Sequence, residues 1–340
     1  NDSFRASFEY FRNETQDMLL GLPIPPSLGY DVAPVANVGN VENRGIEITA
    51  GYSKNSGDFR WSVDGNMSFI SNELTSLGIG NTIFGPGFEG DPVSFTEEGQ
   101  PIAYFYGWEV DGIFQSNEEA QAAPRQNLPD DLADYDPTEH TAAGDIRFRD
   151  LNDDGVINAD DRTNLGHFLP DFTYGLNATA NWKGFDMTLF LQGVSGNQVL
   201  NTTIYDLEGM PRLFNAGTRV LDRWTPQNTD TDVPRAITSD PNRNARISSR
   251  YIEDGSYMRI KNLTIGYSVP AEVLSSFGNG FISNLRIYAS SQNLLTITDY
   301  SGYDPEIGVR QGLNPSLATG VDYGQFPQAR TFIAGVQIGF

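Results

Sequence analysis

Hydrophobic and polar residues alternate along several stretches of about ten residues, and the last ten residues show this most plainly. An apolar residue occupies every second position from Phe332 to Phe340, with Gly or Gln at three of the four positions between them and Ile333 at the fourth. Successive side chains of a strand point to opposite faces, so this pattern is typical of a strand with one apolar face. The sequence therefore predicts that the chain ends in an amphipathic strand over residues 331–340.

The same alternation recurs often enough to predict a repeated structure. Further strands are expected at residues 4–12, 46–53, 59–69, 172–182, 185–191, 257–269 and 285–292. Lys183 and Gly184 form an expected tight turn that makes residues 172–193 a hairpin. Ten residues at about 3.3 Å each, tilted by about 45°, span on the order of 23 Å, close to the roughly 25 Å apolar band of transmembrane barrels. We therefore expect an all-β fold, a transmembrane antiparallel β-barrel with an aromatic residue closing its last strand.

Two long segments, at about residues 79–170 and 207–254, interrupt the strand pattern. Both are rich in turn-forming and acidic residues, and loops of this length are usually functional. Barrels of this kind alternate short turns on one side of the membrane with long loops on the outside, so both segments are expected to be extracellular loops. Neither is predicted to form a separate domain with its own core, and residues 1–340 are interpreted as one portion of a barrel.

Composition narrows the function classes. No run approaches 18 uncharged apolar residues, which excludes a transmembrane helix. The net charge of -22 argues against nucleic acid, whose phosphates would be repelled. The absence of Cys removes disulfide scaffolds, thiol catalysis and Cys-based zinc sites. Residues 1–12 already have a strand pattern with no signal segment before them, so we expect that the chain is the C-terminal part of a longer protein.

The sharpest local motif lies at residues 150–161, whose acidic and amide residues have the spacing of a calcium-binding loop. The candidate ligands at loop positions 1, 3, 5, 7, 9 and 12 are Asp150, Asn152, Asp154, the carbonyl of Val156, Asn158 and Asp161. Gly155, at position 6, permits the sharp turn that such a loop requires. The sequence therefore predicts a calcium ion with a structural role, pinning an exposed loop whose carboxylates would otherwise repel one another.

This loop differs from an EF-hand in two ways. Its last position is Asp161 rather than the longer Glu, and residues 146–149 before it have the pattern of a strand rather than a helix. The shorter acid weakens bidentate closure, which suits a site that works where calcium is abundant. The open alternative is an acidic turn that holds no metal, because Asp, Asn and Gly favour turns in any case.

No pattern indicates an enzyme. The two histidines, His140 and His167, lie in loops and in no known catalytic motif. The glycine-rich residues 78–87 lack the Lys and Ser/Thr of a phosphate-binding loop. We therefore predict no catalytic residue and no cofactor-binding residue. Loop aromatics could stack on sugars, although packing within the loops or at the membrane interface is the stronger alternative for Phe84, Phe88, Tyr104, Tyr106, Trp108 and Trp224.

Several sequence segments resemble SusC/RagA-type TonB-dependent outer-membrane transporters of Bacteroidota, and they occur along the chain in the order in which they occur in that family. Two of them are GDIRFRDLNDDGVI at residues 144–157 and GSYMRIKNLTIGY at residues 255–267. The others are residues 40–47, 113–115, 161–162, 285–294, 303–306 and 326–340. Together these segments cover most of the chain and are far more specific than any one of them.

The resemblance implies a 22-stranded barrel in the cell outer membrane, of which this chain supplies C-terminal strands and contacts outer-membrane lipid. It implies import of large nutrients, oligosaccharides (glycans) or peptides, with a SusD-like lipoprotein as partner and the TonB complex as energy source. The N-terminal plug and the TonB-contacting segment of such transporters are not in this sequence. Two alternatives stay open, a soluble calcium-stabilised β-sandwich module that binds glycans and an outer-membrane barrel of adhesin or enzyme type.

Overall fold

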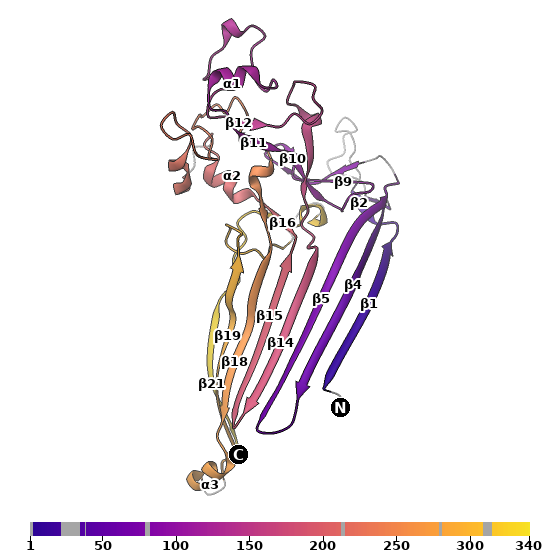
Figure 1. Ribbon diagram of the computed structural model, residues 1–340, viewed down its shortest axis with the longest axis vertical. Helices are drawn as coiled ribbons and strands as arrows, with labels where there is room; N and C mark the ends of the chain where they lie inside the picture. The colour runs from indigo at the N-terminus through magenta and orange to yellow at the C-terminus, as the bar shows by residue number, and fades with distance from the viewer. Residues whose placement is uncertain are drawn as a thin grey trace.

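The main element of the protein is one eight-stranded antiparallel sheet (Figure 1). The computed structural model describes residues 3–21, 35–37, 39–78, 82–211, 215–278, 281–308 and 315–340. The sheet contains, in spatial order, β1 (Phe4–Thr15), β4 (Asn40–Lys54), β5 (Phe59–Ser76), β14 (Phe172–Trp182), β15 (Phe185–Ser195), β18 (Tyr257–Ser268), β19 (Asn284–Thr298) and β21 (Thr331–Gly339). The spatial order of these strands is also their order in the sequence, and all eight strand predictions are confirmed.

The predicted hairpin of β14 and β15 is also confirmed, together with its turn. The register pairs Phe172 with Ser195 and Trp182 with Phe185, which leaves only two residues in the connection. Those residues, Lys183 and Gly184, have φ angles of 46° and 91°. Two positive φ angles in succession are the geometry of the two-residue turn that matches the twist of antiparallel strands. The Lys-Gly pair therefore fixes the register of this hairpin.

One face of the sheet is apolar and carries aromatic residues in two rows. Near the short turns the register aligns Phe59, Trp182, Phe185 and Tyr267. Near the other end it aligns Tyr10, Ile46, Phe69 and Phe172. The rows are ten residues apart along β14, about 24 Å across a membrane for strands tilted by 45°. This spacing matches the two aromatic girdles of a transmembrane barrel.

The apolar face is uncovered in the part of the chain that the structure describes. Phe8 is 67% exposed, Ile265 is 50% exposed and Phe332 is 70% exposed. Large apolar patches in contact with water are rare in soluble monomeric proteins. A β-sandwich would cover this face with a second sheet, and the described residues form no such sheet. The arrangement therefore favours a sheet that faces lipid over the soluble alternative.

The opposite face of the sheet is polar and its side chains bond across strands. Hydroxyl pairs join Ser7 to Thr49, Ser62 to Thr179 and Thr264 to Ser290. Arg286 in β19 forms an ion pair with Asp186 in β15, although β18 lies between them. The pair spans that strand over Gly266, where a Cβ atom would lie 2.6 Å from both the guanidinium and the carboxylate. Glycine at this position therefore makes the long-range ion pair possible.

The connections between the long strands differ at the two ends of the sheet (Figure 1). At the lower end, with both chain termini, lie the turns at residues 55–58 and 183–184 and helix α3 (Ala271–Gly278). The described residues of the long connections, 77–78, 82–171, 196–211 and 215–256, lie at the other end. No helix in the described part of the chain is long and apolar enough to cross a membrane. The predicted asymmetry of short turns and long loops is thus observed.

The connections at this end of the sheet fold into a cluster of short elements, which we call the loop cluster. Its first group is a four-stranded sheet, in the order β13 (Arg162–Gly166), β10 (Tyr104–Trp108), β9 (Ser94–Glu97), β6 (Thr82–Phe84). A hairpin of β11 (Val110–Ile113) and β12 (Ile146–Phe148) and a sheet of β16 (Gln198–Asn201), β17 (Ile252–Asp254) and β20 (Val321–Asp322) follow. Its other strands and α-helices are β2 (Leu19–Gly21), β3 (Val35–Asn37), β7 (Gly87–Phe88), β8 (Asp91–Pro92), α1 (Asn117–Ala122) and α2 (Thr202–Glu208).

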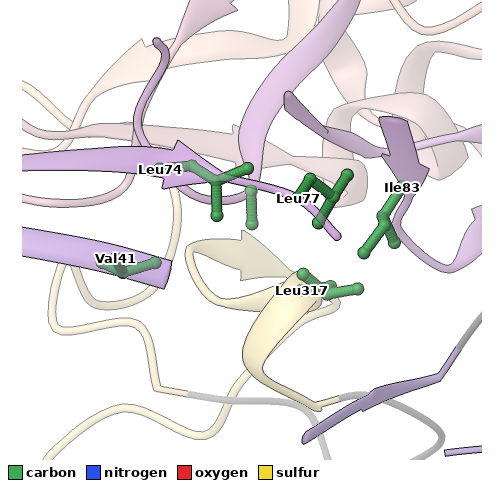
Figure 2. Packing of buried hydrophobic residues seen from close by; sticks show 6 residues of the cluster. Val41, Leu74, Leu77, Ile83 and Leu317 are labelled. Atoms are coloured by element: carbon green, nitrogen blue, oxygen red, sulfur yellow. The ribbon is translucent and has the colours of Figure 1, made fainter. Parts of the chain in front are cut away.

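Buried apolar clusters hold the loop cluster together and fix it to the sheet. Figure 2 shows one of them, in which side chains at the ends of β4 and β5 meet residues from two loops. Its labelled members are Val41, Leu74, Leu77, Ile83 and Leu317. Leu74 is fully buried. The loops are therefore anchored on the upper edge of the sheet by packing, which gives the cluster a defined position.

The first long segment, residues 79–170, contains a small buried apolar cluster; that neither long segment is a separate domain stays a prediction. Trp108, Ile146, Phe148 and Ile157 form a buried cluster, and all of them come from this segment. The strands that carry them are only three to five residues long, and Ile157 lies outside any strand. Such short runs do not stand out from a turn-rich background, which is why the sequence pattern misses this core.

Candidate metal centre and neighbouring cavities

The predicted calcium loop lies between β12 and β13, and its last ligand position closes the loop on its first residues. Asp161 is fully buried. Its carboxylate accepts hydrogen bonds from the main-chain N–H of Leu151 at 3.0 Å and of Asn158 at 2.7 Å. The carboxylate thus replaces backbone partners that the turn would otherwise lack. Asp161 therefore shapes the loop whether or not it binds an ion.

Asp150, at the first ligand position, has an acceptor atom with no partner. Its Oδ2 atom accepts from the N–H of Gly155 at 2.8 Å, and Gly155 has a φ of 79°. Its Oδ1 atom is buried and makes no hydrogen bond. A buried carboxylate oxygen without a partner is costly, and a cation is a partner that would remove the cost. This orphaned oxygen is the observation that fits a bound metal ion.

The other candidate ligands use side-chain oxygens to hold the turn, and Asp154 uses both, since its Oδ2 accepts from Asn152 Nδ2 at 3.1 Å. Asn152 Oδ1 accepts from Asp154 N at 3.0 Å, and Asp154 Oδ1 accepts from Val156 N at 2.8 Å. Asn158 caps the short helix at 159–161 in the same way. Within the described residues no three His, Asp or Glu side chains are close enough to share an ion. The structure thus does not bring the carboxylates of Asp150, Asp154 and Asp161 together around one point. The candidate donors, carboxylate, amide and carbonyl oxygens, are of the kind that calcium prefers.

Contacts from outside the loop hold it in place. Arg125 forms a bridge with the loop, donating its main-chain N–H to Gly155 O and accepting from Ile157 N, both at 2.8 Å. The indole N–H of Trp108 donates to the carbonyl of Asn158 at 2.7 Å. Ile157 is buried against Trp108 in the cluster described above. The loop is thus continuous with the core of residues 79–170, and a change in its conformation would move Trp108.

Two of the cavities that the described residues of the loop cluster line are large enough to hold a small molecule. The larger, about 870 Å³, lies between the β11–β12 hairpin and residues 229–232, and Asp222, Asp230 and Asp232 line it beside Arg250. The smaller, about 410 Å³, lies beside the metal loop and is lined by Trp108, Arg162 and Arg246 among others. Both volumes fall in the roughly 300–1,000 Å³ range of small-molecule sites. Sequence reasoning missed both cavities, because each is built from segments about a hundred residues apart in the chain.

Most of the candidate sugar-stacking aromatics serve the loop core instead. Tyr104 is 2% exposed, Trp108 is 4% exposed and Trp224 is 9% exposed. Burial, followed by the hydrogen bond to Glu97, raises the pKa of the Tyr104 hydroxyl well above its usual range. Phe84 is 45% exposed, and its ring lies 4.9 Å from that of Phe95. The packing alternative is therefore confirmed for the buried three.

A buried ion network lies where β18 meets the segment after β19. Arg259 is 2% exposed and donates to Asp304 at 2.6 Å and to Glu306 at 2.7 Å, while Lys261 also donates to Glu306. Burial acts to raise the pKa of Asp304, but hydrogen bonds from Arg259 and from main-chain N–H groups outweigh it and lower that pKa. Asp304 and Glu306 thus fix the segment after β19 to the sheet through their ion pairs, and only the three-dimensional contacts reveal this role.

Comparison with known proteins gives matches along the whole chain. It is 37% identical over 352 residues to the TonB-dependent receptor P3 of Formosa agariphila, covering 100% of this chain and 33% of that protein. It is 24% identical to the TonB-dependent receptor SusC of Bacteroides thetaiotaomicron, covering 97% of this chain and 29% of SusC. A solved structure of the RagAB peptide transporter matches 99% of this chain and 33% of its own, with 25% identity and a TM-score of 0.78. No protein-family model matches the chain.

The sheet with one apolar face, its two aromatic rows and its one-sided long loops define a portion of a transmembrane antiparallel β-barrel, and the solved transporter structure has the same fold. The chain belongs to the SusC/RagA family of TonB-dependent receptors. The predicted fold class and the predicted family are thereby confirmed. The chain spans about a third of the length of the curated relatives that it matches. Those relatives are named as receptors and the solved structure as a transporter, and none is named as an enzyme.

Proposed function

We propose that this chain forms part of the wall and the outer loops of a barrel that imports large nutrients across the outer membrane. The observation that carries the proposal is the eight-stranded sheet, whose apolar face is uncovered and bounded by two aromatic rows about one membrane thickness apart. The polar face, with its cross-strand hydroxyl and ion pairs, would then line the lumen. Such a surface suits a hydrophilic cargo.

We further propose the partners of this import. A SusD-like lipoprotein would cover the loop cluster from outside, and the TonB complex would supply energy through a region outside these residues. The cargo would be an oligosaccharide or a peptide; the RagAB structure, which has this fold, is of a peptide transporter. The cavities of the loop cluster, 870 and 410 Å³, support capture of a large polar ligand at the mouth of the barrel.

The metal loop would serve this function as a structural element. Calcium would be held by Asp150, Asn152, Asp154, the carbonyl of Val156, Asn158 and Asp161, and it would neutralise their carboxylates. Its role would be to fix the loop that supports Trp108 and the smaller cavity. The orphaned oxygen of Asp150 supports this proposal.

A topology experiment tests the membrane placement. A protease site is inserted in the exposed loop at residues 130–132 of the full-length gene product, and the same site is inserted in the exposed turn at residues 55–58 as the matched control. Protease is then added to intact cells that express either variant. We expect cleavage of the first variant only, because the long loops would face outward and the short turns the periplasm.

A growth experiment tests import. Deletion of the gene is expected to abolish growth on one class of oligosaccharide or peptide as sole nutrient while growth on monosaccharides and amino acids is unchanged. Recovery of the full-length protein in an aqueous extract without detergent would contradict the proposal and favour the soluble module. Correct topology with unimpaired growth on every large nutrient would favour an adhesin instead.

A further inference from the structure

The smaller cavity concentrates positive charge in a strongly acidic protein. The chain has 44 Asp and Glu but only 22 Lys and Arg, yet Arg162, Arg243 and Arg246 all line this space of about 410 Å³. Asp91 is the only acidic side chain in its lining, and it pairs with Arg243 at 3.0 Å. Two positive charges are therefore left over. A cationic cavity that the overall charge does not explain is a candidate site for an anion.

Arg246 is a buried cation that forms no ion pair with the described residues. It is 9% exposed, and its guanidinium lies 5.0 Å from the ring centre of Trp108 and 4.3 Å from that of Phe148. Nε and Nη2 donate to main-chain carbonyl oxygens, and no carboxylate of the described residues is within ion-pair distance. Burial and the charge of Arg243 lower its pKa to about 10, while the charges of Asp240 and Asp91 act in the opposite direction, so it stays charged at neutral pH. Buried charges are usually paired, so this one favours an anionic partner.

Arg162 adds a second guanidinium on the same indole. It lies 5.3 Å from the ring centre of Trp108 and 5.0 Å from that of Tyr106. Its Nε donates to the carbonyl of Ala159, and in the described part of the chain it forms no ion pair. Trp108 is 4% exposed, and two guanidinium groups lie against its ring, so the indole is not free to stack on a neutral ligand. It instead holds the arginines in place through cation–π contacts.

The unpaired side-chain amide of Gln126 is a second, independent observation that points to a ligand. It lines the same cavity, and both its Nε2 and its Oε1 are buried without a hydrogen-bond partner. A buried amide normally bonds through both atoms, since each unsatisfied buried polar atom is destabilising. The amide offers one donor and one acceptor group side by side. A ligand that satisfies both needs an acceptor oxygen and a hydroxyl, and the side chains of Asn127 and Asn158 lie in the same lining.

We propose that this cavity binds a negatively charged sugar unit of an oligosaccharide, one that carries a carboxylate or a sulfate group. The anionic group would bind Arg162 and Arg246, and sugar hydroxyls would bond the amide of Gln126. The proposal rests on the proposed function, because it names the class of nutrient that the transporter captures. The metal loop would then position part of the cavity, since Asn158 lies in that loop and Arg162 directly follows it.

Calorimetry on the full-length gene product in detergent tests the site with four probes of equal length. They are a uronate oligosaccharide, a sulfated oligosaccharide, a neutral oligosaccharide and an acidic peptide. We expect one or both acidic oligosaccharides to bind and the neutral one to bind at least tenfold more weakly; comparison of the first two distinguishes carboxylate from sulfate. Arg162→Gln is expected to weaken that binding about tenfold or more, because it removes charge-assisted hydrogen bonds.

Two further variants control the result. Gln126→Glu keeps the shape of the side chain but adds a negative charge, and it is expected to abolish binding. Arg149→Gln removes the same charge as Arg162→Gln from a residue of the loop cluster that pairs with Glu109 outside the cavity, and it is expected to leave binding unchanged. Resistance to protease identifies any variant that fails to fold.

Three results would overturn the inference. They are equal affinity for neutral and acidic oligosaccharides, equal losses in Arg162→Gln and Arg149→Gln, or binding of the peptide in place of the sugars with the same dependence on Arg162. Binding in detergent needs neither TonB nor transport, so a protein that binds acidic sugars but supports no growth on them would contradict the proposed import and leave the site intact.

Discussion

Replacing Asp150 by Asn probes the calcium proposal with a minimal change of shape. In the structure one carboxylate oxygen of Asp150 accepts from Gly155 N, and the other is buried without a partner. The amide introduced by this substitution can keep the first bond through its oxygen and place its nitrogen where the orphaned oxygen lies. A nitrogen that carries protons cannot bind a cation. We therefore expect Asp150→Asn to lose the response to calcium while the loop without calcium is no less stable than in the native protein.

The size of the calcium effect follows from mass action. Extracellular calcium modules bind with dissociation constants of about 10⁻⁴ to 10⁻³ M, and position 12 of this loop is the short Asp161. At about 10 mM calcium the ion is present at roughly 10 to 100 times that constant, which stabilises the bound loop by about 1.4 to 2.7 kcal/mol. Where cleavage follows the population of the opened loop, this slows proteolysis about tenfold to a hundredfold.

Limited trypsin digestion of the full-length gene product, in about 10 mM calcium or in chelator, measures this effect as the rate of cleavage after Arg149. The matched control is Asp153→Asn, which removes the same charge from a loop position that is not a predicted ligand. Asp153 has a φ of 59°, a conformation that Asn tolerates as well as Asp does. Native protein and control should be protected by calcium and Asp150→Asn should not. Equal protection of all three, or of none, would refute the reasoning.

Two further predictions concern stability in detergent. Asp304→Asn should lower the unfolding temperature at pH 7, because it weakens the ion pair with buried Arg259. The pKa of Asp304 is lowered in the fold, so this stabilisation is present above about pH 4 and is lost as the pH falls further. Thermal scans of the native protein and the variant should therefore converge in acid, and a difference that stays constant with pH would contradict the ion pair. Gly266→Ala should lower the free energy of unfolding by about 1–3 kcal/mol, because its Cβ atom would lie 2.6 Å from Arg286. The control Gly65→Ala, whose Cβ atom would have no atom closer than 3.7 Å, should unfold like the native protein. Equal losses of stability in the two variants would contradict the role of Gly266.

The sheet could be predicted from the sequence because each long strand repeats one simple signal over about ten residues. The alternation at 172–182 and the turn residues Lys183 and Gly184 determine both the strand and its register. The candidate calcium ligands at residues 150–161 are likewise recognised from their fixed positions within one short loop. Both signals are local, so neither depends on contacts between distant parts of the chain.

The loop cluster could not be predicted because its order depends on contacts between distant segments. Strands β10 and β13 are only five residues long and hold together by pairing with each other. The cationic cavity unites Trp108, Arg162 and Arg246, which no spacing rule connects. The spacing predicts Asp150 as a ligand, but the unsatisfied state of its Oδ1 atom appears only in the folded loop.

The central claim is that the apolar face of the sheet contacts lipid, and single-cysteine labelling of β14 tests it most directly. These 340 residues contain no Cys, so Leu176→Cys, Asn177→Cys, Ala178→Cys and Thr179→Cys each add one thiol, whose labelling is measured against the unsubstituted protein. In outer-membrane vesicles, fluorophores at 176 and 178 should be quenched by a quencher dissolved in the lipid. Residues 177 and 179 should instead react with a water-soluble thiol reagent, because successive side chains lie on opposite faces. Reaction of all four positions with the aqueous reagent, or no alternation among them, would contradict the account.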